Sequence, residues 1–210
     1  MRVFNGKPTR NDITRVDSAS PTAANESKAI MCAIDAHEGR DVATADVPNA
    51  LIQTDMPEPK PGEDRVTMKI TGELVNMIVE LDPELHLNYV VYKGKRKVIY
   101  VIILKALYGV LVASLLWYEK FRKDLESIGF VFNPYNPCVA NRMIDGKQHT
   151  VRFHVDNIMS SHVESKVNNK FLQWLDRNHG KLKKVRATRG KIHEYLGMMI
   201  NFLNKRKVKF

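Results

Sequence analysis

The sequence predicts an α+β fold: an antiparallel-rich sheet with helices packed on one face. Two kinds of apolar segment lead to this prediction. Some are short runs typical of strands, and in others apolar residues recur every three or four positions, as on one side of a helix. From residue 98 onward these segments follow the order βαβββαβ, in which successive strands form hairpins. With 210 residues and 44% apolar content, the chain can bury a substantial core.

A helix followed by short strands is expected in residues 1–104. Ser20-Pro21 is typical of a helix start, because serine caps the first turn and proline suits the first helical position. Gly39 is expected to end that helix. The strand expected at 98–104 is apolar throughout and is expected to be buried. Apolar runs predict the strands at 42–47, 66–70, 89–92 and 98–104.

Two amphipathic helices are expected in the second half of the chain. In the first, apolar residues recur every three to four positions from Leu111 to Ile128. The second begins near Val163 and closes at Gly180. Asp145-Gly146, a dipeptide favoured in hairpin turns, joins two of the strands that lie between the helices. The strands of this half are expected at 138–144, 149–155 and 195–203.

The tetrapeptide His154-Val155-Asp156-Asn157 lies between apolar stretches and is expected to form the tip of a hairpin. Two adjacent carboxylates on such a turn are one way to hold Mg²⁺ against nucleotide phosphates. This turn carries only one carboxylate, followed by the neutral amide of Asn157. Since Asp and Asn are both good turn formers, a purely structural hairpin is the alternative interpretation.

Positive charge is concentrated in the second half of the chain. Lys and Arg number 13 against 15 Asp and Glu in residues 1–100, and 20 against 8 in residues 101–210. This asymmetry predicts a phosphate backbone as the partner, with a solvated basic surface as the alternative. The candidate contacts are Lys181, Lys183, Lys184, Arg186, Arg189 and Lys191.

No apolar segment of signal-peptide type is found at the N-terminus, and the longest apolar run is too short to cross a bilayer. An intracellular protein with no membrane partner is therefore expected. Cys32 and Cys138 lie far apart without a CxxC spacing. Buried free thiols are expected, rather than a disulfide or a zinc site.

Six motifs in this order and spacing resemble the reverse transcriptase of copia-type retrotransposons, the RNA-dependent DNA polymerase domain of the pol polyprotein. No single motif is specific, but their common order is. The motifs are Asp-Val-Ala-Thr-Ala-Asp-Val at 41–47 with Ala50, Lys-Ala-Leu-Tyr-Gly at 105–109, Leu-Trp-Tyr-Glu-Lys-Phe at 116–121, Gly-Phe at 129–130 with Asn-Pro-Cys-Val at 136–139, His-Val-Asp-Asn at 154–157, and Tyr-Leu-Gly-Met at 195–198.

This resemblance implies a right-hand polymerase palm with partial fingers. It assigns residues 1–40 to partial fingers, 41–47 to the palm strand with the first carboxylate, 48–104 to a fingers-side insertion, 105–204 to the palm, and 205–210 to the start of a missing thumb, so that the chain is expected to be truncated. The implied reaction is template-directed transfer of nucleotidyl groups from deoxynucleoside triphosphates to a primer 3′-hydroxyl on an RNA or DNA template, with pyrophosphate as the leaving group. The implied setting is a cytoplasmic particle or the nucleus, and full-length relatives carry RNase H and integrase on the same polyprotein.

The resemblance also implies a role for each site residue. Asp46 and Asp156 would bridge two Mg²⁺ or Mn²⁺ ions, with the backbone carbonyl of Val47 as a further ligand. Leu51, Tyr108 and Gly109 would contact the substrate. The primer end would be supported by Tyr195, Leu196, Gly197 and Met198.

The chain departs from the family pattern at Asn157 in the hairpin turn and at Leu51 among the substrate contacts. Asn157 stands where the family has Asp, so polymerase activity is expected to be weak or absent. Leu51 stands where the family has Phe or Tyr, which predicts poorer rejection of ribonucleotides. The alternative function is that of a catalytically inactive retrotransposon remnant that at most binds nucleic acid non-specifically.

Overall fold

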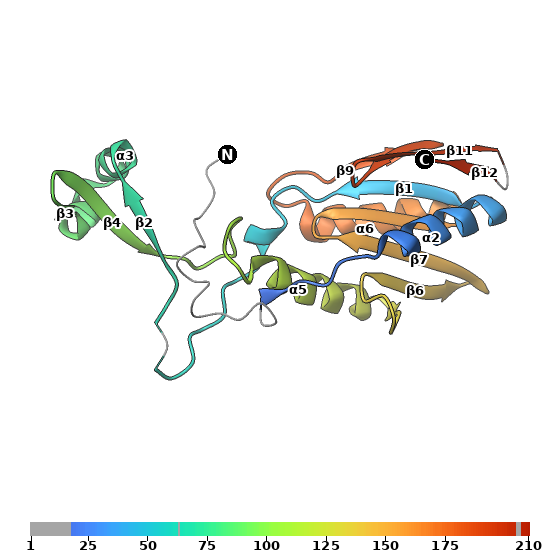
Figure 1. Cartoon of the computed structure of the whole chain (residues 1–210), viewed down its shortest axis with the longest axis horizontal. Coiled ribbons are helices and arrows are strands. Elements are labelled where there is room, and N and C mark those ends of the chain that lie inside the picture. Colours follow the sequence, from blue (N-terminus) through green and yellow to red (C-terminus); the bar gives the residue numbers. More distant parts are fainter. Residues whose placement is uncertain (1–17, 63, 205–206) are drawn as a thin grey trace.

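The structure is a computed structural model that describes residues 18–62, 64–204 and 207–210. Residues 1–17 of the expected fingers segment and residues 205–206 of the expected thumb start lie outside the described residues. The described chain has two parts (Figure 1): a larger body around a six-stranded sheet, and a smaller distal lobe, defined as residues 67–102, that extends from one end of it. None of the described helices is long and apolar enough to cross a membrane.

The six-stranded sheet has the order β5-β6-β7-β8-β1-β9, and all of its neighbouring strands are antiparallel. The strands β5 to β8 follow one another along the chain. In contrast, β1 comes from much earlier in the sequence and lies between β8 and β9. The strands are β1 (Asp41–Asp46), β5 (Val131–Phe132), β6 (Val139–Ile144), β7 (Lys147–His154), β8 (Asn157–His162) and β9 (Arg186–Arg189).

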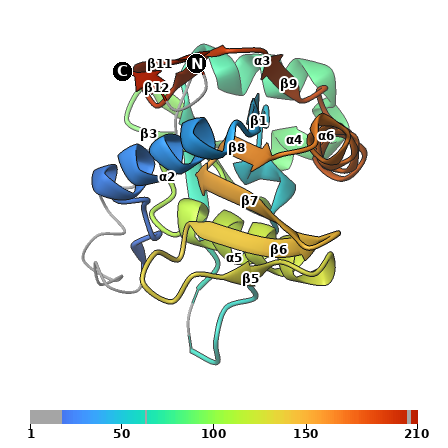
Figure 2. The ribbon, with the colours of Figure 1, turned by 90° about the vertical axis from the view of Figure 1, so that its right-hand side faces the viewer.

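Helices cover both faces of this sheet (Figure 2). On one face lie α5 (Ala113–Ser127) and α6 (Ser165–His179), where Phe121 and Phe171 contact the β7 side chains Phe153 and His149. On the other face lies α2 (Asn25–Glu38), whose Lys28 carbonyl accepts a hydrogen bond from Arg152 of β7. The expectation of helices on one face only is therefore wrong. Residues 149–153 of β7 are buried on both faces, so both faces need a cover.

A second, three-stranded sheet lies on the same face as α2. It consists of β10 (Ile192–Tyr195), β11 (Met198–Asn204) and β12 (Lys207–Lys209). The expected single strand 195–203 is thus two strands, joined by a turn at Leu196 and Gly197 with φ values of 51° and 77°. A small core joins this sheet to α2, β1 and β8, through Cys32, Val42, Met159, Tyr195 and Ile200.

The distal lobe has its own sheet, of order β2-β4-β3, and two short helices. Three of the seven residues of the apolar run expected to be a buried strand are in fact exposed, since Tyr100, Ile102 and Leu104 expose 43%, 52% and 62% of their surface. A lobe of this size has too few elements to cover both sheet faces. Its elements are β2 (Thr67–Thr71), α3 (Glu73–Leu81), α4 (Pro83–His86), the 3₁₀ helix Leu87–Tyr89, β3 (Val91–Lys93) and β4 (Arg96–Ile102).

Local turn and capping patterns predicted some element boundaries better than others. The hairpin at Asp145-Gly146 is confirmed, and both residues have the positive φ that this turn needs. Gly39 ends α2 in the left-handed conformation, as expected. The helix begins later than Ser20-Pro21, because Ala24 is its N-cap and no side chain caps it there.

Candidate active site at the ends of β1 and the β7–β8 hairpin

The register between β1 and β8 places Asp46 directly opposite Asn157. The β7–β8 turn consists of Val155 and Asp156, because His154 pairs with Asn157. The backbone N–H of Val47 donates to the Asp156 carbonyl at 2.9 Å and ties the end of β1 to this turn. Opposed residues of antiparallel strands point to the same face with neighbouring Cβ atoms. The fold therefore brings Asp46 and the Asp156-Asn157 pair together.

The backbone of this turn is strained, and a side chain of α5 holds it by a hydrogen bond. Val155 has a φ of 52°, a conformation that β-branched residues rarely adopt. Its carbonyl accepts a hydrogen bond of 2.7 Å from the indole Nε1 of Trp117, which is completely buried. Such conformations persist only where the surroundings enforce them, and they cluster at functional sites.

Two neutral donors bind the carboxylate of Asp156. The Tyr108 hydroxyl donates to Oδ2 and the Asn157 amide donates to Oδ1, both at 3.0 Å. Burial, followed by the negative charges of Asp156 and Asp46, raises the pKa of Tyr108 to about 12. Tyr108 thus remains a protonated donor at neutral pH. Because the negative charges of Asp156 and Asp46 both raise the pKa of Tyr108, its hydroxyl lies close to both carboxylates.

Asp46 is bound by an arginine. Arg186 of β9 pairs with Asp46 in the sheet register, and its Nε and Nη2 donate to Oδ2 at 3.0 and 2.6 Å. Arg189, at the other end of the same strand, donates to Asp41 at 2.8 Å. Both arginines were expected to contact phosphates. In the structure their guanidinium groups bind carboxylates of β1. No local sequence pattern indicated these ion pairs, because β9 is a short strand within a basic stretch, and the phosphate contacts stay a prediction.

The divalent cations that the resemblance implies require an anionic, oxygen-rich set of ligands. Asn157 adds no charge, each oxygen of Asp156 already accepts a hydrogen bond, and Asp46 faces a guanidinium. Among the described residues there is no group of three or more His, Cys, Asp or Glu that could hold a metal ion. As arranged, these residues do not fit a two-cation site.

The other expected substrate contacts lie at different depths. Val47 is completely buried and Leu51 is 2% exposed, so both side chains belong to the main core, which also contains Trp117, Phe121 and Phe153. The effect of Leu51 on ribonucleotide rejection stays a prediction. Gly109 is exposed and has a φ of 98°, a conformation that glycine adopts without strain.

Three of the expected nucleic-acid contacts are exposed beside the carboxylates. Lys181, Lys183 and Lys184 lie in the segment between α6 and β9. This segment leads directly into Arg186, opposite Asp46, so it lies at the same end of the sheet (Figure 1). Lys191 follows the other end of β9 and is remote from the pair along that strand. The basic residues therefore do not form one continuous face.

The expected primer-end motif forms the β10–β11 hairpin turn. Tyr195 is 2% exposed, and the Arg152 guanidinium lies 4.9 Å from the centre of its ring. Leu196 and Met198 pack against the small core. Only Gly197 is exposed, so the motif joins the second sheet to the body through its side chains.

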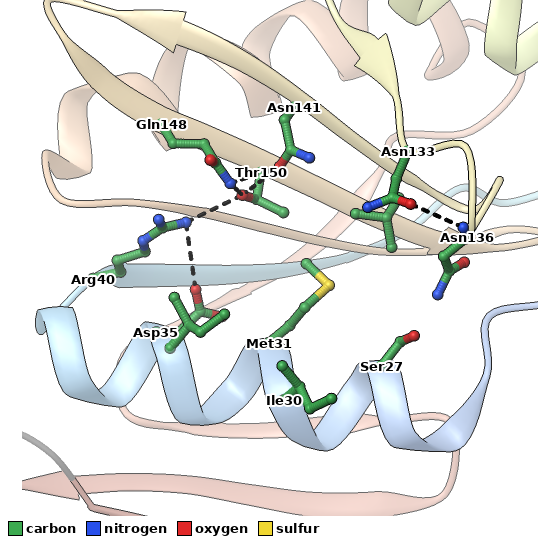
Figure 3. Close-up of a pocket in the computed structure, with 12 residues that line it drawn as sticks. Ser27, Ile30, Met31, Asp35, Arg40, Asn133, Asn136, Asn141, Gln148 and Thr150 are labelled. Carbon is green, nitrogen blue, oxygen red and sulfur yellow. Dashed lines mark hydrogen bonds and ion pairs between the residues drawn. The ribbon is translucent and has the colours of Figure 1, made fainter.

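A separate cavity of about 240 Å³ lies between α2 and the strands β6 and β7 (Figure 3). Its walls combine Met31 and Ile30 with polar groups, among them Asp35, which is bound by Arg40, and the Asn136 amide, whose Nδ2 has no hydrogen-bond partner. Burial raises the pKa of Asp35 to about 6. Sequence reasoning missed this cavity, because its residues come from distant segments without a local motif.

No family model matches the chain, and no curated protein matches it. Among solved structures, it is similar to apo telomerase from Candida tropicalis truncated from the C-terminal domain, with a TM-score of 0.48, 9% identity, and 96% of this chain and 42% of that chain covered. It is also similar to telomerase from Candida albicans in complex with a TWJ fragment of telomeric RNA, with a TM-score of 0.41, 8% identity, and 96% and 37% covered. The chain thus spans less than half the length of either. The function of the chain is therefore inferred from the geometry of the carboxylates and from the sequence motifs.

Proposed function

We propose that this chain is the palm-containing part of a copia-type reverse transcriptase, with nucleotidyl transfer impaired by Asn157. The six-stranded sheet with α5 and α6 is assigned to the palm, the described part of residues 1–40 with α2 to partial fingers, and the distal lobe to the fingers-side insertion. The substrates are a template–primer and deoxynucleoside triphosphates, and RNase H and integrase are the proposed polyprotein partners. One observation carries the proposal: the register that puts Asp46 opposite Asn157, beside Asp156 on a strained turn.

Restoring the second carboxylate tests this function. Asn157→Asp is expected to raise Mg²⁺- or Mn²⁺-dependent primer extension by about 10² to 10³, because a lost electrostatic partner in an active site has about this effect on rate. The measurement is single-nucleotide incorporation on a labelled primer. Asn157→Asp combined with Asp46→Asn serves as the control and should return the rate to background. Equal rates for the original chain and Asn157→Asp at saturating Mg²⁺ or Mn²⁺ would contradict the proposal.

The second candidate is a protein that binds nucleic acid but performs no chemistry. The observation that favours it is the binding of both carboxylates by the chain's own donors, next to the exposed Lys181, Lys183 and Lys184. Binding of a labelled oligonucleotide should then weaken steeply with salt and be indifferent to a chelator. Affinity that requires Mg²⁺ would instead favour the polymerase.

A further inference from the structure

The misfit between this site and a divalent cation centres on Arg186. Its strand register, not a flexible reach, brings it to Asp46, because β9 pairs with β1 residue by residue from Arg189 to Arg186. Two of its nitrogens share the single oxygen Oδ2. The Arg186 side chain is 70% exposed and that of Asp46 is 32% exposed, so the pair lies where solutes can reach it.

Asn157 gives the other carboxylate a neutral hydrogen-bond donor. Its amide donates to Asp156 Oδ1, where a second carboxylate would instead repel the first. The two side chains together give each acidic group of the site a donor from the chain itself. Both carboxylates therefore have a hydrogen-bond partner within the chain, without an external cation.

We infer that the Arg186 guanidinium takes the place of a divalent cation at Asp46, so that metal binding requires Arg186 to leave. Charge repulsion supports this exclusion. At about 5 Å in water-like surroundings, a unit positive charge disfavours a dication by roughly tenfold in affinity. The inference rests on the proposed function in one respect: a divalent metal ion is the cation that a polymerase would bind at Asp46.

Mn²⁺ binding, followed by the electron paramagnetic resonance signal of the free ion, tests this inference without any activity. Arg186→Gln is expected to bind Mn²⁺ roughly tenfold more tightly than the original chain. Asn157→Asp with Arg186→Gln is expected to gain roughly tenfold more, since it adds a negative charge to the site. The matched control is Arg189→Gln, which removes an ion pair of the same strand without touching Asp46 and should leave Mn²⁺ affinity unchanged.

Arg186→Lys tests whether the positive charge at position 186, and not a change in the fold, sets the Mn²⁺ affinity. It keeps the positive charge, so its Mn²⁺ affinity should stay at the original level. The melting temperature of Arg186→Gln should rise at a Mn²⁺ concentration roughly tenfold lower than the one needed for the original chain. Equal Mn²⁺ affinities of Arg186→Gln and the original chain, or equal dependence of their melting temperatures on Mn²⁺, would overturn the inference.

The outcomes also separate this inference from the proposed function. If Asn157→Asp extends primers while Arg186→Gln gains no Mn²⁺ affinity, the inference fails and the polymerase assignment stands. If Asn157→Asp with Arg186→Gln binds Mn²⁺ tightly but extends no primer, Arg186 excludes the cation and the polymerase assignment fails.

Discussion

Fully buried histidines make the stability of this protein sensitive to acid. Burial lowers the pKa of His149 to about 3 and that of His179 to about 4, and it also lowers the pKa of His193. The unfolded chain takes up protons near the ordinary value of 6.5, so these groups stabilise the fold above that pH and lose their contribution as the pH falls below it. Asp35, with its raised pKa, acts in the opposite direction below pH 6.

His179→Phe should reduce this sensitivity. The ring lies 5.4 to 5.8 Å from those of Trp117, Phe121 and Trp174, and neither ring nitrogen has a hydrogen-bond partner. Its Nε2 lies 3.5 Å from Asp124 Oδ2, but burial outweighs this carboxylate and keeps the pKa of His179 low. Phenylalanine fits these aromatic contacts and binds no proton. The loss of unfolding free energy between pH 7 and pH 5 should be smaller by on the order of 2 kcal/mol.

Urea unfolding at the two pH values measures this effect. The control is His37→Phe, at an exposed position near the end of α2. Identical pH dependence in His179→Phe and the original chain would show that His179 does not contribute to the acid sensitivity.

Among the secondary-structure elements, α5 supports the candidate site without contributing a charged group to it. Trp117→Phe removes the donor to the Val155 carbonyl and leaves a gap in a completely buried region. A loss of about 3 kcal/mol in unfolding free energy is expected from these two effects. The β7–β8 turn should also loosen, because its left-handed residue loses the contact that holds it.

Urea midpoints and amide exchange at the turn measure the two consequences of this substitution. Trp174→Phe on α6 is the comparison, since that side chain is only half-buried and no hydrogen bond to the turn is lost. An equal destabilisation by the two substitutions, with unchanged exchange at the turn, would argue against support by α5.

At the scale of the whole molecule, the distal lobe is nearly separate from the body. Its two ends meet, because the Ile103 N–H donates to the Val66 carbonyl at 2.9 Å. Within residues 67–102, Met68 is the side chain that packs against the main core. Replacing residues 67–102 by Asn-Gly, which suits a tight turn, should leave the body folded.

Circular dichroism and urea unfolding of the shortened chain check this independence. A cooperative transition with a midpoint close to the original is expected, and a chain without cooperative unfolding would contradict it. Oligonucleotide binding should persist in part, because Lys181, Lys183 and Lys184 remain beside the carboxylates. Loss of the lobe's lysines should lower the salt dependence of binding.

Most of the elements of the body could be predicted from local sequence patterns. Periodicity predicted α5 and α6, a turn dipeptide predicted the β6–β7 hairpin, and the motifs singled out Asp46 and Asp156. These signals are local: helix period, turn chemistry and residue type are all readable within about a dozen positions. They also identified the missing charge at Asn157, because that depends on residue identity alone.

The groups that surround the two carboxylates depend on contacts between residues far apart in the sequence. Arg186 reaches Asp46 because β1, 140 residues earlier in the chain, is inserted between β8 and β9. The position of α2 on the second face, and the exposure of Tyr100 in an apolar run, likewise depend on which surfaces remain uncovered after packing. Strand neighbours and layer contacts join residues far apart in sequence, and their energies have no local signature. For this reason the acidic pair was predictable, and the guanidinium group that binds Asp46 was not.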